Sequence, residues 1–431
     1  MYRYFMPARR ILLIACLSVA GCAHPRVGAP GGPGGPGAPG QVEVPEDKCL
    51  LSTGSVATHT VTVTIGLTDA VDPRHAPLGR NDAERIVFRH LYETPVRIDC
   101  DGHAVPELFD QWTKDDAGRR WTFRLRDGAQ FWDGAPVTAQ DVVFGRGGIG
   151  YTLSAPPPAP DTRAVTVTLA KETNDVPIVL GDRSLTVTKS APDTSWPIGT
   201  GRFWATSGTT TAQEIRAHSP QGDTIVFKFA TSGDARDLLD AGVDLLVTRD
   251  RALRDYGATL QNRTVVALPW DRTYVFVSGS AEATRFDAGG LEQAVHAEAR
   301  RAEGDFWWRD LRACGIARDT APPAPTTKRI LYARADQAGR ELAGRLAALT
   351  HAVATGRAPD DFSAALAGGK DWGYVVALPR VTADACRSAR DLLPSWPATF
   401  TALVDTRATA IVRRGVARWT VDQDGTVHLA P

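Results

Sequence analysis

The chain has 431 residues, with 49 basic and 49 acidic side chains, 43% hydrophobic residues and 23% charged residues. These values are typical of an ordinary globular protein of two or three domains, so they exclude a chain that is disordered throughout. The balanced charge argues against a nucleic-acid-binding protein, because affinity for phosphates requires clustered lysine and arginine.

The N-terminus has the pattern of an export signal over residues 1–21. Arg9 and Arg10 precede an apolar run that ends in small residues directly before Cys22. This run is too short to span a bilayer. The junction resembles the lipobox of bacterial lipoproteins, which implies cleavage before Cys22 and acylation of this residue, because several acyl chains give durable anchoring. An ordinary secretory signal with an accidental cysteine is the alternative.

Residues 22–55 are predicted to form a tether between the anchor and the folded part. Its segment 29–40 consists of glycine, proline and alanine only. Proline removes backbone donors and glycine has a large backbone entropy, so such a segment neither packs nor forms a helix. A folded body that begins near residue 56 is therefore expected to be separate from the membrane.

From Thr60 onward, strand and helix patterns alternate. Strands are predicted at Thr60–Leu67, Trp121–Arg126, Ala164–Leu169, Thr224–Phe229, Val243–Val247, Arg263–Pro269, Thr273–Val277, Ile330–Tyr332, Thr401–Val404, Ala410–Val412 and Trp419–Val421. Helices are predicted at Asp82–Tyr92 with Asp82 as a possible cap, at Thr138–Val143, at Asp234–Ala241, and where Leu342, Leu346 and Leu349 share one face. Mixed segments of this kind favour an α/β protein with two lobes.

Four cysteines lie beyond the signal region, namely Cys49, Cys100, Cys314 and Cys386. Their spacing does not fit a metal site, and an even number in an exported protein favours disulfides. Three pairings are possible. We expect Cys49–Cys100 and Cys314–Cys386, because each pair falls in one sequence neighbourhood; free buried thiols are the alternative.

Several segments resemble family 5 of the extracellular solute-binding proteins, the dipeptide, oligopeptide and nickel receptors of ABC importers. Trp121–Val143 is the most specific, with its "tF.LR.G..F.DG.p.tA.DV" pattern. Arg85–Glu93 and Asp99–Leu108 are similar to the family's opening, Pro197–Gly201 to its glycine-rich turn, and Asp234–Leu245 to its "l..GevDl" unit. The glycines and capping residues of these segments have scaffold roles of their own, so they are not assigned to a ligand.

The resemblance implies a two-lobed periplasmic-binding-protein-like fold of type II, cluster C-like, with mixed sheets. Lobe I would take residues 56–280, a shortened lobe II residues 281–395, and residues 396–431 would return to lobe I. It implies a monomeric, lipid-anchored, extracytoplasmic receptor without cofactor that captures a small solute, foremost a peptide, between its lobes and delivers it to an ABC importer permease. A degenerate relative that acts as an envelope interaction or scaffold lipoprotein is the alternative.

The chain departs from the family pattern in its second lobe. The expected "R.Al..aiDR" helix corresponds to Leu291–Arg300, which lacks the leading arginine. The "W..DY.dP" loop, whose aspartate holds a peptide amine, has Lys370–Tyr374 as its nearest match, followed by two valines. The peptide assignment is therefore weaker than the family assignment, and a metal chelate is an alternative solute.

Three groups of residues are candidates for the ligand site. The first is Trp270, Asp271, Arg272 and Tyr274, in which an arginine and two polar-tipped aromatics lie close together; a local ion pair with both rings in the core is the alternative. The second is Asp371, Trp372 and Tyr374, for which a plain strand entry is the alternative. The third is Asp69 and Asp72, after the first strand. The cluster Phe306–Trp308 is assigned to packing.

Motifs of enzymes and of built-in metal sites are absent from the sequence. Gly145–Gly150 matches GxGxxG, but a proline-rich run follows instead of the helix that a dinucleotide requires. The sequence contains no GxSxG, HExxH, P-loop or CxxC motif, and the nine histidines are scattered. The protein is therefore predicted not to be an enzyme and to hold no metal of its own.

Overall fold

The fold was analysed in a computed structural model. It describes residues 49–52, 61–115, 117–143, 152–154, 163–169, 172–191, 196–230, 233–278, 307–308, 312–314, 328–380 and 400–430. The signal region, most of the tether, and the segments 279–306, 315–327 and 381–399 lie outside these ranges, as do Gly145–Gly150 and Leu291–Arg300.

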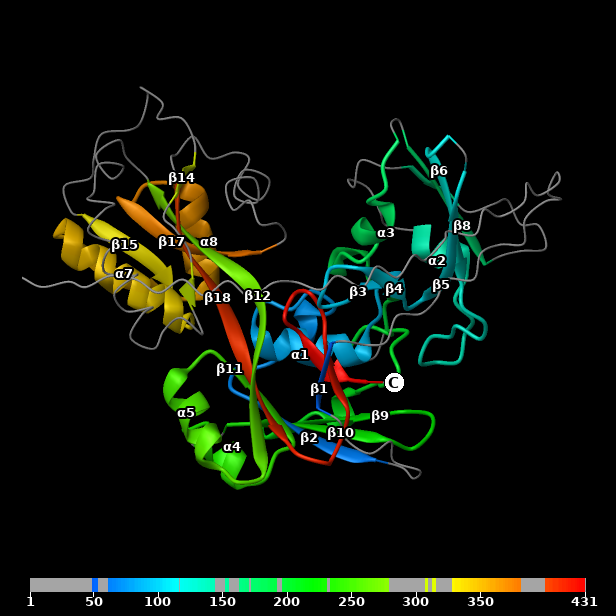
Figure 1. Cartoon of the computed structure of the whole chain (residues 1–431), viewed down its shortest axis with the longest axis horizontal. Coiled ribbons are helices and arrows are strands. Elements are labelled where there is room, and N and C mark those ends of the chain that lie inside the picture. Colours follow the sequence, from blue (N-terminus) through cyan, green and yellow to red (C-terminus); the bar gives the residue numbers. More distant parts are fainter. Residues whose placement is uncertain are drawn as a thin grey trace, which may run out of the picture. The chain divides into compact units, whose positions relative to one another are not determined.

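A mixed sheet of eleven strands forms the centre of the described chain (Figure 1). Its main order is β16-β15-β17-β12-β18-β11-β2-β10-β9, and β13 and β14 also pair with β18. In chain order these strands are β2 (Thr62–Leu67), β9 (Glu214–His218), β10 (Thr224–Phe229), β11 (Leu245–Thr248), β12 (Arg263–Ser278), β13 (Trp307–Trp308), β14 (Arg312–Cys314), β15 (Arg329–Ala333), β16 (Val353–Arg357), β17 (Gly373–Pro379) and β18 (Phe400–Arg413).

Three smaller sheets accompany the large one, in the orders β1-β19-β20, β3-β4 and β5-β6-β8-β7. Their strands are β1 (Leu50–Ser52), β3 (Val96–Ile98), β4 (Ala104–Pro106), β5 (Phe109–Lys114), β6 (Arg120–Leu125), β7 (Thr152–Ser154), β8 (Ala164–Thr168), β19 (Trp419–Val421) and β20 (Val427–Leu429). In the four-stranded sheet, Gly128 and Gly134 have φ values of 70° and 81°, which explains why the two Asp-Gly turns of the signature segment require glycine.

The helices are short, and polar side chains cap several of them. They are α1 (Asp82–Leu91), α2 (Ala139–Val143), α3 (Val176–Val179), α4 (Arg236–Asp240), α5 (Arg251–Thr259), α7 (Gln337–Thr350) and α8 (Pro359–Gly368), with 3-10 turns η1 (Pro73–His75), η2 (Arg183–Leu185) and η3 (Ser207–Thr209). The cap of α1 is Asn81, whose side chain accepts from Glu84 N–H, so the expected cap Asp82 was wrong by one residue.

The two long strands β12 and β18 correct the sequence analysis, which divided each of them into two strands. They pair with each other along nearly their whole length, and the pairing shifts register between Ala267 and Trp270, between Trp270 and Arg272, and between Tyr274 and Val275. Such bulges accommodate extra residues, here next to Pro269, without ending a strand. Pro269 therefore suggested that a strand ends there, although β12 continues through it.

The strand pairings show that two halves of the sheet point their carboxyl ends toward each other. In the first half, β2, β10 and β11 run parallel to one another. Both β11 and β12 are antiparallel to β18, so β12 runs in the same direction as these three strands. In the second half, β15, β16 and β17 run parallel to one another and antiparallel to β12. Since β12 leaves the first half and enters the second, each half ends at the segment where β12 and β18 pass between them (Figure 1).

Each half of the sheet has its own hydrophobic core. In the first half, α1 packs with β2, β10, β11, β18 and β19 around Phe88, Trp196 and Trp419. In the second half, α7 packs on β12, β15 and β18 through Leu342 and Leu346. Leu349, which was expected on the same face of α7, is 40% exposed and is not part of this core.

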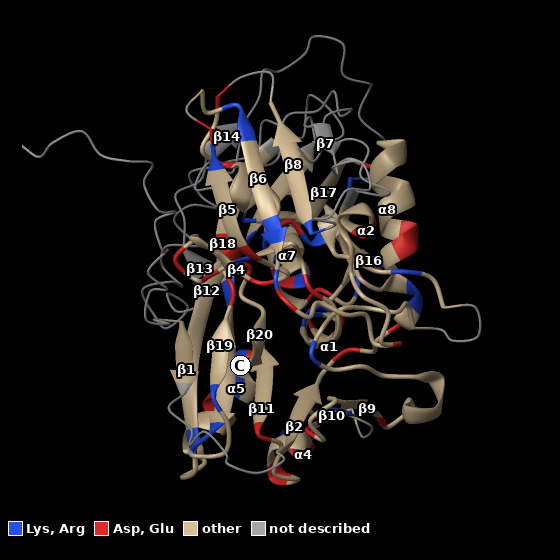
Figure 2. Ribbon diagram, turned by 90° about the vertical axis from the view of Figure 1, so that its right-hand side faces the viewer, with Lys and Arg blue, Asp and Glu red and all other residues tan. Residues whose placement is uncertain are grey.

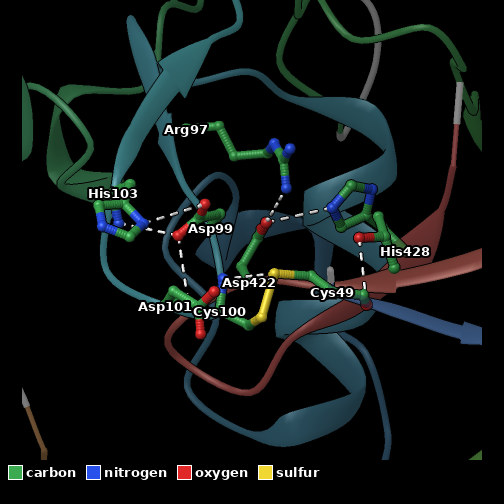
Figure 3. The surroundings of a disulfide bond; sticks show 9 residues. Cys49, Arg97, Asp99, Cys100, Asp101, His103, Asp422 and His428 are labelled. Atoms are coloured by element: carbon green, nitrogen blue, oxygen red, sulfur yellow. Dashed lines mark hydrogen bonds and ion pairs between the residues drawn. A yellow bond between two sulfur atoms is a disulfide. The ribbon is translucent and has the colours of Figure 1, made fainter. Parts of the chain in front are cut away.

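The disulfide expected between Cys49 and Cys100 is present and closes a stretch of 51 residues (Figure 3). Cys49 is buried, and β1, which directly follows it, pairs with β19. Cys22 and Cys386 lie outside the described residues, and for Cys314 the structure describes only the backbone in β14. The disulfide thus attaches the N-terminal strand to the body of the protein.

We expect the double variant Cys49→Ala/Cys100→Ala to have a free energy of unfolding about 2–4 kcal/mol lower than the parent, because a cross-link over a long loop restricts the unfolded chain. Urea unfolding under non-reducing conditions measures this, with both proteins carrying Cys22→Ser. After reduction with dithiothreitol, the two proteins should unfold at the same urea concentration. Equal midpoints before reduction would contradict the expectation.

Candidate functional site

The facing carboxyl ends of the parallel strands place several loops at one location. In α/β sheets, ligands bind outside the carboxyl ends of the strands, because loops and helix N-termini meet there. Here β2 leads into Asp69, and β15 leads into Asp336, the N-cap of α7. Tyr274 on β12 donates its hydroxyl to Asp336 at 2.7 Å. The acidic first turn of α8, red in Figure 2, carries Asp360, which pairs with Arg80 at 3.4 Å.

A cluster of charged side chains lies between these ends. We call it the hinge cluster, and it comprises Asp82, Arg85, Arg249, Asp271 and Arg272. The Arg85 guanidinium lies 2.7 Å from Asp82 and 3.1 Å from Asp271, and Arg249 reaches both carboxylates as well, with its Nε 2.7 Å from Asp82. Arg272 also donates to Asp82. The cluster therefore connects α1, the end of β11 and the middle of β12.

Asp82 and Arg249 of the hinge cluster remain charged at neutral pH. Burial alone would raise the pKa of Asp82, but Arg249, Arg272 and Arg85 together hold it well below its usual range. The pKa of Arg249 is raised because Asp271 and Asp82 outweigh the effect of its burial. Although Arg85 Nε has no hydrogen-bond partner among the described residues, the other contacts of the cluster fix the position of β12 relative to α1 and β11.

The first predicted group, Trp270 to Tyr274, therefore divides among three environments. Asp271 and Arg272 belong to the hinge cluster, and their mutual distance of 3.8 Å is longer than their contacts with other members. Tyr274 is fully buried in the core of the second half and is bonded to Asp336. Trp270 is half-buried, and the Arg407 guanidinium lies 4.4 Å from the centre of its ring.

The second predicted group, Asp371, Trp372 and Tyr374, lies at the other end of β17 from the hinge cluster. Tyr374 donates its hydroxyl to Ala365 O at 2.9 Å and accepts from Asp371 N–H at 3.0 Å. Asp371 pairs with Arg329 at 2.8 Å, and Trp372 is 2% exposed. These are the contacts of a strand entry, the alternative that the sequence left open.

The third predicted group follows β2 and is adjacent to the hinge cluster. Asp69 is half-buried, and burial followed by the charge of Asp82 raises the pKa of its carboxyl group. Asp72 caps the 3-10 turn η1, and hydrogen bonds from Arg74 lower its pKa. Asp69 is thus the member of this pair that faces the charged residues around the carboxyl ends.

A cavity of about 560 Å³ adjoins the hinge cluster along β12. We call it the β12 cavity. It is lined by Cys49–Leu51, Cys100 and Asp101, Val266–Trp270, Arg380, and Val421 with Gln423. Its volume lies in the range of small-molecule sites. Except for Trp270, the sequence analysis assigned none of these residues to a ligand, because four distant segments contribute to the lining and no local pattern connects them.

A second cavity, of about 110 Å³, lies on the other side of the turn between β19 and β20. Asp422 in its wall lies 3.4 Å from Arg97 and 3.1 Å from His428 (Figure 3), and 2.6 Å from Arg89. Asp424 pairs with Arg183 at 2.8 Å. Burial would raise the pKa of Asp422, but Arg89, His428 and Arg183 hold it well below its usual range. The charges are mutually satisfied, so this cavity belongs to the packing of the first half.

Within the described residues, no group of three or more His, Cys, Asp or Glu side chains is arranged to hold a metal ion. None of the helices in the same ranges is both long enough and apolar enough to cross a bilayer.

Comparison with known proteins agrees with the fold and with the signature segment. The model of the bacterial extracellular solute-binding proteins, family 5 (middle region), matches residues 103–242. The periplasmic oligopeptide-binding protein OppA of Escherichia coli is 44% identical over 61 residues, which are 14% of this chain and 11% of OppA. The murein peptide-binding protein MppA of the same organism is 48% identical over 58 residues, 14% of this chain and 11% of MppA. The matched segments therefore span only about a tenth of these curated relatives.

Solved structures extend the likeness to most of the chain. NikZ of Campylobacter jejuni, solved in complex with Ni(L-His), superposes with a TM-score of 0.60 at 12% identity, covering 85% of this chain and 97% of NikZ. MppA of Escherichia coli gives a TM-score of 0.60 at 12% identity, covering 88% of this chain and 100% of MppA. At such identities the likeness establishes the fold. Residues 103–242 are thus similar to the bacterial extracellular solute-binding proteins of family 5, and the chain has the α/β fold of NikZ and MppA.

Proposed function

We propose that the protein is an extracytoplasmic receptor that captures a small solute and delivers it to an ABC importer, without catalysing a reaction. The observation that carries this proposal is the solute-sized β12 cavity, which lies where the carboxyl ends of both halves of the sheet meet. The similarity of residues 103–242 to the solute-binding proteins of family 5 supports the same role.

Binding would act through the two strands shared by both halves. A ligand that contacts both halves favours the arrangement in which they enclose it, and it shifts the population toward that state. β12 and β18 are the connections about which such a movement would occur. The hinge cluster, to which Arg272 belongs, holds β12 to the first half, and Trp270 and Asp69 lie beside it as candidate contacts for the solute.

The finer points of the sequence analysis belong to the same proposal. Acylation of Cys22 would anchor the protein to a membrane of the bacterial envelope. Of the predicted tether at residues 22–55, the part before Cys49 would connect the anchor to the body, because Cys49–Ser52 belong to the body itself. The lobe boundaries at residues 280 and 395 and the shortened second lobe also stay predictions. Labelling of cells with radioactive palmitate tests the anchor: we expect incorporation into the wild type and none into Cys22→Ser.

A peptide is the first candidate for the solute, because the two curated relatives described above bind oligopeptides or murein peptides. A metal chelate is the second, since NikZ was solved with Ni(L-His). The sequence weakens the peptide assignment through the missing acidic loop after Tyr374. Thermal unfolding with each solute class therefore has to distinguish a peptide from a metal chelate.

Thermal unfolding of the purified Cys22→Ser protein tests the proposal. A ligand that binds only the native state raises the melting temperature, and a concentration one hundred times the dissociation constant stabilises the protein by about 2.7 kcal/mol. We expect a rise with one class among short peptides, nickel–histidine chelates and sugars. If the melting temperature stays constant with all of them, the receptor proposal is wrong and a scaffold lipoprotein is the better interpretation.

A further inference from the structure

We propose that the β12 cavity selects solutes with an apolar body and a carboxylate, and that the terminal guanidinium nitrogens of Arg380 bind this carboxylate. This inference rests on the proposed function and specifies the chemistry of the solute. Three observations support it: the apolar residues in the lining of the cavity, the donors of Arg380 that have no partner among the described residues, and the position of Trp270.

Most of the residues that line the cavity are apolar, and its exposed surface combines apolar and polar atoms in similar parts. On one side, the wall is formed by Val266–Trp270 of β12. Along this stretch β12 pairs with β18 only, because its pairing with β17 begins at Arg272. On the other side lie Leu50 and Leu51, held by the Cys49–Cys100 disulfide, together with Val421. A wall of this kind binds an apolar group by removing it from water.

Arg380 is held in place through its backbone N–H and its Nε. Its backbone N–H donates to Asp271 O at 2.8 Å, and its Nε donates to Asp405 at 3.0 Å. Within the described part of the chain, its two terminal nitrogens have no hydrogen-bond partner, and its side chain is 30% exposed. A guanidinium fixed through Nε still offers parallel N–H groups, which match the geometry of a carboxylate.

Trp270 adds a flat apolar surface next to this donor. The Arg407 guanidinium lies 4.4 Å from the centre of its ring, which fixes the indole at the cavity wall. Its indole N–H makes no hydrogen bond to the residues that the structure describes. An aromatic ring with a free polar edge binds an apolar group and one acceptor at the same time.

Asp101 places a negative charge in the lining of the cavity. Its backbone N–H is bonded to Asp99, while its carboxylate has no partner in the described ranges. The carboxylates of Asp101 and of a solute repel each other, so a solute acid is directed to Arg380, and a second negative charge is disfavoured. The expected solute is therefore a monocarboxylate or a zwitterion with an apolar body.

Isothermal titration calorimetry on the Cys22→Ser protein tests this selectivity with two matched pairs. These are leucyl-leucine with its C-terminal amide, and octanoate with octylamine. We expect each acid to bind at least tenfold more tightly than its partner, because the partner cannot accept the two guanidinium hydrogen bonds. Equal binding of acid and partner would overturn the inference.

Arg380→Gln is the diagnostic variant, and Arg340→Gln, an exposed arginine on α7, is its control. We expect Arg380→Gln to weaken binding of the acids ten- to a hundredfold and to leave the amide unchanged, while Arg340→Gln changes neither. Because Arg380 also contacts Asp405, the melting temperature without ligand is measured first. If Arg380→Gln fails to fold, Arg380→Lys replaces it; this variant keeps the charge, loses the paired donors, and should still weaken acid binding.

The outcomes separate this inference from the proposed function. If nickel–histidine or the amides bind and the acids do not, the receptor function stands and the carboxylate selectivity is wrong. Unchanged acid affinity in the Arg380 variant also overturns it. If no solute of any class binds, the proposed function fails and the inference fails with it.

Discussion

Asp271→Asn should lower the free energy of unfolding by about 3–5 kcal/mol. The Asp271 side chain is 1% exposed and receives Arg249 and Arg85, the latter at 3.1 Å. Removing one partner of a buried ion pair costs this much, because the desolvated Arg85, Arg249 and Arg272 would then share the single carboxylate of Asp82. Asparagine is nearly isosteric, so the loss reports charge and not volume. Urea unfolding at pH 7 measures the difference.

Asp234→Asn is the matched control, because Asp234 pairs with Arg236 at 2.7 Å but lies on the surface. Exposed pairs contribute little to stability, so this variant should unfold at the urea concentration of the parent. If Asp271→Asn also unfolds like the parent, the hinge cluster does not hold β12 in place, and its assignment as a support of the site is wrong.

The second large effect concerns acid stability, which we expect to depend on His90. Its ring is buried, its Nδ1 lies 2.7 Å from Ile86 O, and its Nε2 lies 3.1 Å from the N–H of Leu429. Nε2 therefore accepts, Nδ1 carries the proton, and the ring is neutral. Burial, assisted by the positive surroundings of His428 and Arg89, lowers the pKa of His90 from 6.5 to about 3.

A histidine with a lowered pKa destabilises the protein as the pH falls. The unfolded chain binds a proton below pH 6.5, whereas the native state does so only near pH 3, so the free energy of unfolding decreases between these values. The decrease is about 1.4 kcal/mol per pH unit, which gives about 3 kcal/mol between pH 6.5 and pH 4. Urea unfolding across this range measures the slope.

Two variants distinguish His90 from the other acid-sensitive groups. In His90→Gln, the glutamine amide can also donate and accept hydrogen bonds. The slope of the free energy of unfolding against pH between pH 6.5 and pH 4 should then be smaller by about 1.4 kcal/mol per pH unit, which corresponds to one proton. His103→Gln changes a histidine whose side chain is 72% exposed, so it should keep the slope of the parent. An unchanged slope in His90→Gln would assign the acid sensitivity elsewhere, foremost to His428, whose pKa burial also lowers.

The sequence by itself determined the local structure and the resemblance to family 5. Alternating residues in Trp121–Leu125, the Asp-Gly turns and the helical spacing in α1 depend on interactions between neighbours in the chain, which a sequence displays directly. The Cys49–Cys100 pair was expected from proximity in the chain. The resemblance came chiefly from the Trp121–Val143 segment, whose residues are contiguous and lie within the matched range 103–242.

Only the tertiary structure decided where the candidate site lies and which side chains are available there. Asp271 and Tyr274 seemed suited to a ligand, but Arg249 and Asp336, which are distant in sequence, occupy them. Arg380 and Gln423 gave no signal, because they reach the β12 cavity from separate segments. The physical reason is that a polar side chain is available to a ligand only if no other side chain satisfies it, and those competing partners come from anywhere in the chain.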